Sequence, residues 1–189
     1  LWRYSRRPLD AEAMRDAMLA VSGNLDRTAS GPHPFPDVET WNFTIHHPFH
    51  AVYGSDHRSV YLMKQRNRRH PYLELFDSAD PNVSIGKRQQ TITPTQALYL
   101  MNSEFVHAQA QRLAHRIAVA FPRRTERIKY AFKLVHGVPV SAAEMRAACA
   151  FLDEYINAAQ EGRNLDGSKE AWEAFSRVLL TSNRFLFVD

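Results

Sequence analysis

Four histidines lie close together in the segment TIHHPFHAVYGSDH, and imidazole nitrogens are common ligands of zinc and copper. They are His46, His47, His50 and His57. His46 and His47 are adjacent, so in a strand their side chains point to opposite faces. No carboxylate lies between His46 and His50, and Pro48 interrupts the regular backbone. We therefore expect surface or hydrogen-bonding histidines, with His46, His47 and His50 only weak candidates for metal ligands.

A second cluster of chemically active residues is a basic run that alternates with tyrosines. Its members are Arg58, Lys64, Arg66, Arg68, Arg69 and His70. Arginines combined with aromatic rings such as Tyr61 and Tyr72 can bind phosphate or sulfate groups. Acidic residues follow closely, at positions 74, 77 and 80, and can neutralise part of the run. Two interpretations remain open: an anionic-ligand groove, and a surface whose charges are solvated or paired internally.

Asp77 and Asp80 are the best-placed carboxylates for acid–base chemistry, which needs two such groups, or one and a histidine, in a single cleft. They lie three residues apart around a turn, beside Asn82. Aspartates in such turns commonly accept backbone hydrogen bonds instead. The sequence has no G-x-S-x-G, H-E-x-x-H, P-loop or dinucleotide fingerprint. An enzyme is therefore less expected than a binding domain.

The single cysteine, Cys149, excludes a disulfide within the chain and the C-x-x-C-H motif of covalent haem attachment. It follows Met145 and precedes Leu152 on an apolar helical stripe, which predicts a buried, unreactive thiol. We expect no cofactor in this chain.

Helical periodicity positions most of these residues. An N-terminal helix is predicted to start after Asp10 and to stop at Gly23. Thr93 and Gln96 form a T-x-x-Q capping box around Pro94, which predicts a short helix over 94–101. A longer helix is expected to restart at once from Asn102 or Ser103. The interruption turns the chain, so that two apolar faces reach one core from different directions.

Three further helices are predicted, capped by Thr125, by the Ser141–Glu144 capping box and by Ser168. Apolar residues recur at three- and four-residue steps along each. The residues expected to face inward are Phe105, Val106, Ala110, Leu113, Ile117, Ile128, Phe132, Val135, Ala148, Leu152, Tyr155, Ile156, Trp172, Phe175, Val178 and Leu179.

Two short β-prone runs, WNFTI (41–45) and SVYLM (59–63), predict a small hairpin within residues 41–66. With 189 residues, 44% of them apolar, and a net charge of only +4, the chain is expected to form one domain over 1–189. The predicted fold class is mainly α, a single helical domain with a small inserted β-hairpin. No apolar run approaches the roughly 20 residues of a transmembrane helix. The chain starts at Leu1, so we expect a fragment of a larger multidomain protein.

Five segments occur in an order that is similar to a known family. They are RRPLDAEAMRDAMLAVSGNLD (6–26), HRSVYLMKQR (57–66), ELFDSADPNVS (74–84), TPTQALYLMNSEFV (93–106) and LLTSNRFLFVD (179–189). The chain resembles the C-terminal domain of unknown function (number 1553, PSD-type) of planctomycete cytochrome-c-associated proteins. The resemblance covers essentially the whole chain.

This resemblance implies an exported or periplasmic protein, with haem c only in a cytochrome-c-like domain upstream. It makes nucleic acid an unexpected partner, and it implies no catalytic residues. The recurrent polar positions of the family correspond here to Arg15, Asp16, Asp77, Asp80, Asn82, Thr93, Gln96 and Asn102.

We therefore expect a non-catalytic accessory or interaction domain, which docks against its haem-bearing neighbour or retains a substrate such as a polysaccharide near it. The alternative is a catalytic module that acts on polysaccharide, for example a sulfated one, while the upstream haem domain exchanges electrons.

Overall fold

A computed structural model describes residues 6–31, 54–66, 68–163 and 167–188. The helices are α1 (Ala11–Ser22), η2 (a 3-10 helix, Ser59–Tyr61), α2 (Pro71–Leu75), α3 (Pro94–Asn102), α4 (Glu104–Ala120), α5 (Arg124–His136), α6 (Ala142–Arg163), α7 (Ser168–Leu180) and α8 (Asn183–Leu186). The strands are β1 (Arg7–Pro8) and β2 (Phe187–Val188). The mainly helical class predicted from the sequence is confirmed.

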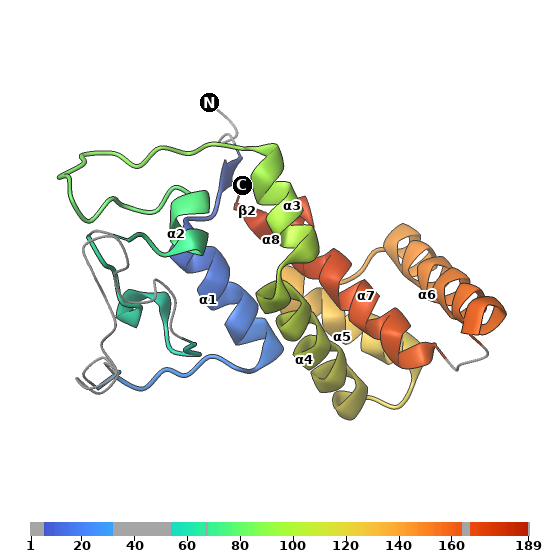
Figure 1. The fold of residues 1–189 in the computed structure, drawn as a ribbon. Helices are drawn as coiled ribbons and strands as arrows, with labels where there is room; N and C mark the ends of the chain where they lie inside the picture. Colours follow the sequence, from blue (N-terminus) through green and yellow to red (C-terminus); the bar gives the residue numbers. More distant parts are fainter. Residues whose placement is uncertain (1–5, 32–53, 67, 164–166, 189) are drawn as a thin grey trace.

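The core forms where α4 packs along α7, with α1, α5 and α6 against this pair. Figure 1 shows α4, α5 and α7 near the centre, α6 at one end of the molecule and the segment 54–93 at the other. Met18, Leu113, Ile117 and Leu180 are completely buried between these helices. Each such side chain contributes about 1.5–3 kcal/mol through the apolar surface that it removes from water. Apolar burial therefore stabilises the packing of α1, α4, α5, α6 and α7.

The small sheet lies away from the predicted hairpin. β1 and β2 pair antiparallel, with Arg7 opposite Val188 and Pro8 opposite Phe187. The Leu9 N–H extends this pairing by donating to the Leu186 carbonyl at 2.8 Å. The sheet therefore joins the segment before α1 to the segment after α8.

The prediction of a strand at SVYLM is wrong, because Ser59–Tyr61 form the 3-10 helix η2. The physical reason is a set of contacts from α1. The Asp16 carboxylate accepts the Ser59 N–H at 2.7 Å, and Val60 remains exposed instead of packing in a sheet. Tertiary hydrogen bonds thus override β propensity here. The other predicted strand, WNFTI, lies outside the described residues.

Several predicted helix boundaries are confirmed. Both capping boxes form: the Ser141 N–H donates to Glu144 at 2.8 Å, and the Thr93–Gln96 pair is reciprocal as well. Gly23 ends α1 in the left-handed conformation (φ 84°), which glycine adopts without steric cost.

Other predicted caps are wrong. α5 begins after Arg123 rather than Thr125, and α7 after Gly167 rather than Ser168. Asp10 and Ser103 do occupy the predicted N-cap positions of α1 and α4, but neither makes a capping side-chain hydrogen bond.

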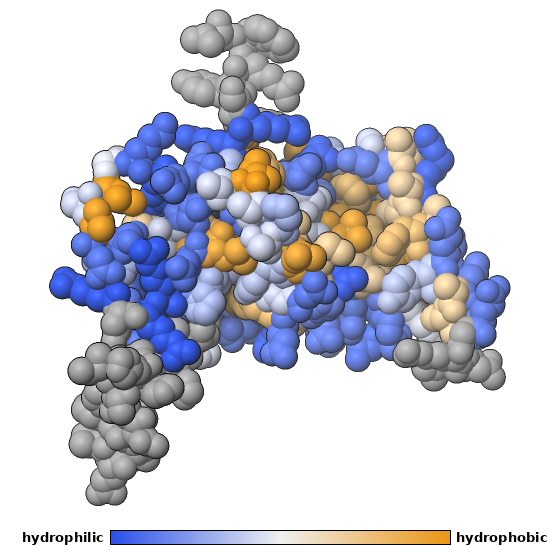
Figure 2. Space-filling view, turned by 45° about the horizontal axis from the view of Figure 1, so that its top comes forward, coloured by the Kyte–Doolittle hydropathy of each residue, from blue (hydrophilic) through white to orange (hydrophobic). Residues whose placement is uncertain are grey.

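Some residues expected inside are exposed, including Val178 and Tyr155, and Cys149 is only partly buried. On α3, Leu100 is buried, whereas Leu98 and Met101 are 57% and 62% exposed. A nine-residue helix that packs on one side leaves apolar surface on the other. Figure 2, with the top of Figure 1 turned forward, shows apolar residues in separate patches across the middle of this face, bordered by polar ones.

Candidate binding site

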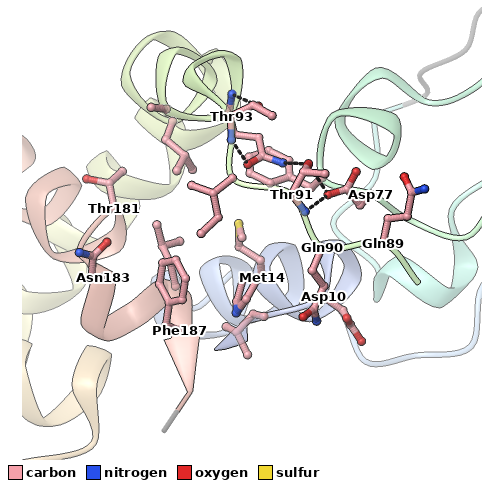
Figure 3. A pocket seen from close by; sticks show the side chains of 18 of the residues that line it. Asp10, Met14, Asp77, Gln89, Gln90, Thr91, Thr93, Thr181, Asn183 and Phe187 are labelled. Atoms are coloured by element: carbon pink, nitrogen blue, oxygen red, sulfur yellow. Dashed lines mark hydrogen bonds between the residues drawn. The ribbon is translucent and has the colours of Figure 1, made fainter. Parts of the chain in front are cut away.

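Two adjoining cavities share Asp77 and Gln89 as a common wall. The first, which we call the apolar cavity, has a volume of about 290 Å³. Its apolar lining comes from distant parts of the chain: Pro8, Leu9, Met14, Phe76, Ile92, Ala97, Leu100, Met101, Leu186 and Phe187. Figure 3 shows Met14 and Phe187 on one side of the opening, with Thr93 across from them. Ile92 and Met101 keep most of their surface exposed to solvent.

One wall of the apolar cavity depends on the capping box of α3. The Thr93 N–H donates to Gln96 Oε1 at 3.1 Å, and Thr93 Oγ1 accepts the Gln96 N–H at 3.3 Å. The Gln96 side chain also donates to the Leu75 carbonyl at 2.9 Å, which ties α3 to the end of α2. A buried amide group thus fixes the distance between two walls.

Asp77 fixes the wall that the two cavities share. It adopts a left-handed backbone (φ 56°), which aspartate tolerates better than most residues. Its carboxylate accepts both the N–H and the hydroxyl of Thr91, at 2.7 and 2.6 Å. These hydrogen bonds, drawn in Figure 3, keep residues 89–93 beside the cavity. With its carboxylate engaged in this way, Asp77 has a structural role in the loop.

The second cavity, which we call the polar cavity, has a volume of about 350 Å³. It brings Lys64, Arg69 and His70 of the predicted basic run together with Asp77 and Asp80. Arg58, Arg66 and Arg68 are not among its lining residues. The structure therefore gathers only half of the basic run into one place.

The charges of the polar cavity are largely compensated. Lys64 pairs with Glu12 of α1 at 3.1 Å, and Arg69 is bonded to Asp80. Burial lowers the pKa of His70, and the nearby Arg15 charge lowers it further, so this imidazole is neutral at pH 7. Outside the cavity, Arg58 approaches Asp16 at 3.9 Å.

Arg15 and Asp16 of α1 organise the loop before η2. Arg15 is 6% exposed, and its guanidinium donates to the carbonyls of Ser55 and His57 and to Ser59 Oγ. It also lies over the Phe105 ring, 5.5 Å from the centroid. Burial lowers the pKa of Arg15 from its ordinary value, but arginine stays charged at any physiological pH. Arg15 is therefore a structural cation that satisfies loop carbonyls.

The remaining polar positions named from the sequence have local partners. The Asp80 carboxylate accepts the Asn82 N–H at 2.9 Å, and the Asn82 side chain donates to the Arg66 carbonyl at 2.9 Å. Asn102 donates to the Leu98 carbonyl at 3.0 Å instead of capping α4. All eight positions named from the sequence thus make hydrogen bonds that shape turns, caps or loops.

The histidine group is described only in part, since His46, His47 and His50 lie outside the described residues. His57 Nδ1 lies 3.3 Å from Asp26 Oδ2. The backbones of these two residues form an isolated parallel bridge. In the described part of the chain, no group of three or more His, Cys, Asp or Glu side chains could hold a metal ion.

A serine–histidine pair is a feature that the sequence did not indicate, because its members are 46 positions apart. His136 Nε2 lies 3.0 Å from Ser182 Oγ. The Ser182 hydroxyl donates its single proton to the Leu179 carbonyl at 2.8 Å, so His136 donates to Ser182 and does not remove its proton. Neither residue lines either cavity. The pair therefore lacks the arrangement of an activated nucleophile.

No helix in the described ranges has both the length and the apolar character that a membrane crossing requires. The family model described as PSD1, protein of unknown function (DUF1553), matches residues 1–152. Neither the comparison with curated proteins nor the comparison with solved structures returned a match.

Proposed function

The chain belongs to the family described as PSD1, protein of unknown function (DUF1553), and from this premise we propose that it is a non-catalytic interaction domain. Its partner is a protein surface that docks at the apolar cavity. The supporting observation is a preformed apolar cavity whose rim exposes Ile92 (76%) and Met101. Exposed apolar surface beside a cavity is typical of binding sites.

The hydrogen bonds of Asp77 and Asp80 support a binding function over a catalytic one. Asp77 accepts two hydrogen bonds from Thr91, and Asp80 is engaged with Arg69 and the Asn82 amide. A general acid or base needs a proton-transfer position that faces the substrate. These carboxylates instead stabilise the turns that form the cavity walls.

The resemblance to cytochrome-c-associated proteins supplies the proposed partner. The apolar cavity docks the cytochrome-c-like domain upstream in the same exported polypeptide, and haem c belongs to that domain. The single cysteine of this chain agrees with this division of roles, because covalent haem attachment requires two.

Docking can be tested by mixing this chain with the separately produced haem-bearing segment and measuring affinity by isothermal titration calorimetry. Met101→Asp introduces a charge at the cavity rim, and we expect at least a tenfold loss of affinity. Leu98→Asp is the matched control, because Leu98 lies on the same helix and is similarly exposed but does not line the cavity. Equal effects of the two substitutions, or no binding by the unmodified chain, would contradict the proposal.

A second candidate function, binding or cleavage of a sulfated polysaccharide, is favoured by one observation. The polar cavity does combine Asp77 and Asp80 with Lys64 and Arg69 of the basic run. Retention on a heparin-like column tests the binding step. If this function operates, Arg69→Ala, which removes one cation from the lining of the polar cavity, shortens retention, while Arg146→Ala, which removes one exposed arginine of α6, does not. Unchanged retention would remove this candidate.

A further inference from the structure

We propose that the occupant of the apolar cavity is an extended peptide segment that pairs with the backbone of residues 89–93 and carries a basic residue two positions from a bulky apolar one. This inference rests on the proposed docking function and specifies the chemistry of the docked segment. Three features carry it: the backbone amides of residues 89–93, the size of the cavity, and the charge of its rim.

The first feature is the hydrogen bonding of the segment 89–93. The N–H groups of Thr91 and Thr93 donate to Asp77 and Gln96, and Thr93 has an extended backbone (φ −121°, ψ 151°). Alternate amides of an extended chain point in opposite directions. The amides of Gln90 and Ile92 alternate with these two along the chain, and no hydrogen bond from either is found among the described residues.

Free amides at alternate positions form the edge to which a second extended chain can bind. In such β-strand addition, main-chain hydrogen bonds supply affinity, and cavities that accept alternate side chains supply specificity. The apolar cavity begins beside Ile92 and is therefore placed to receive a side chain of the added strand.

The second feature is the size of the cavity. Its volume of about 290 Å³ is roughly twice that of the ~150 Å³ apolar cavity that admits benzene. One aromatic side chain or two aliphatic ones would occupy it. A folded helix would be too wide, since a helix with its side chains is about 10 Å across.

The third feature is the charge of the rim. The lining contains two carboxylates, Asp10 and Asp77, and no lysine, arginine or histidine. Figure 3 shows both carboxylates on the same side of the cavity, with Gln89 and Gln90. Arg88 approaches Asp10 only at 3.9 Å, and Asp10 remains half exposed. A basic residue of the peptide would gain from this rim, and an acidic one would be repelled.

Fluorescence anisotropy with labelled pentapeptides tests the proposal on the 189-residue chain at low ionic strength. The probes are Lys-Val-Leu-Val-Lys, Glu-Val-Leu-Val-Glu, and the lysine peptide with N-methyl groups at alternate amides. We expect the lysine peptide to bind at least tenfold more tightly than either of the others. Equal affinities, or no binding of the lysine peptide at millimolar concentration, would overturn the proposal.

Variants that remove the charges of Asp10 and Asp77 test whether these carboxylates cause the preference for the lysine peptide. Asn tolerates a left-handed backbone, and its amide oxygen can still accept the Thr91 N–H, so Asp77→Asn removes charge without removing the turn. Together with Asp10→Asn it should reduce the preference for lysine over glutamate to about twofold. Glu154→Gln, an exposed change on α6, should leave the preference unchanged. A preference that survives in the double variant would contradict the assigned role of the rim.

Met101→Asp separates this inference from the docking function on which it rests. If Met101→Asp abolishes docking of the haem-bearing segment but the lysine and glutamate peptides bind equally, only the peptide chemistry is wrong. If Met101→Asp changes neither docking nor peptide binding, the docking function itself is wrong.

Discussion

The segment 54–93 depends more on polar contacts than the helical core does. The core buries apolar side chains of α1, α4, α5 and α7 against each other. Among the described residues of segment 54–93, only η2 and the five-residue α2 are helical. Tyr72 and Leu73 of α2 are buried against Ala11, and polar side chains of α1 also hold the segment: Glu12, Arg15 and Asp16. Both cavities are built partly from this polar segment. The candidate site therefore depends on hydrogen bonds together with a small apolar contact between α2 and α1.

The largest effect is expected in the core. Ile117→Ala removes a fully buried side chain between α4 and its neighbours. It should lower the free energy of unfolding by about 2–5 kcal/mol, through lost burial and the cavity left behind. Urea denaturation followed by circular dichroism measures this loss. A change below about 1 kcal/mol would mean that the helices do not share one packed core.

A smaller and more local effect is expected where Arg15 contacts the loop. Arg15→Ala leaves the carbonyls of Ser55 and His57 without their charged donor. The free energy of unfolding should fall by about 1.5–3 kcal/mol, the range for hydrogen bonds to charged groups. Amide hydrogen exchange should accelerate in residues 54–62 while α4 and α7 keep their protection. Uniform acceleration through all helices would show that the two regions are not separable.

The two capping boxes stabilise helix starts in the same way, but only the Thr93–Gln96 box lies beside the apolar cavity. Thr93→Ala and Ser141→Ala each remove one side-chain acceptor at a helix start, which costs about 1 kcal/mol. Only Thr93→Ala alters a wall of the apolar cavity, so only this change should weaken binding at the cavity. Thermal unfolding and the pentapeptide assay together test this distinction. Loss of binding in both variants would link the cavity to overall stability instead.

The smallest expected effect is on the pH dependence of stability, through Glu12. Burial acts to raise the pKa of Glu12, but hydrogen bonds from Arg88, from its own backbone amide and from Lys64 outweigh it and lower the pKa below the usual value. Because the folded pKa is depressed, the stabilisation is present above the unfolded pKa and disappears as pH falls through the folded pKa. Glu12→Gln should therefore reduce stability at pH 7, with the difference from the unmodified chain shrinking below about pH 4.5. A difference that grows on acidification would contradict this sign.

The core could be predicted from the sequence because its determinants are local. The Thr93–Gln96 and Ser141–Glu144 boxes and the Gly23 stop each involve residues within a few positions, and all three were found in the structure. The wrong caps at Thr125 and Ser168 are errors of one or two residues, which is usual at helix ends.

The candidate site could be predicted only in part because its contacts span long sequence distances. Asp77 and Asp80 were correctly placed in turns, but no local pattern indicated that Asp77 would bind Thr91 or that Phe187 would line a cavity with Met14. The one available signal was Met101 on α3, an apolar residue that lines the cavity but lies outside the buried face of the helix. Likewise, β propensity predicted a strand at SVYLM because it takes no account of the Asp16 carboxylate.

Hydrogen exchange of residues 89–102, measured in this chain alone and after mixing with the haem-bearing segment proposed as its partner, tests the docking site most directly. Docking at the apolar cavity predicts slower exchange for Gln90 and Ile92 and for the exposed face of α3 in the mixture, and loss of this protection in Met101→Asp. Identical exchange in both forms, or protection confined to residues 64–70 at the polar cavity, would contradict the account.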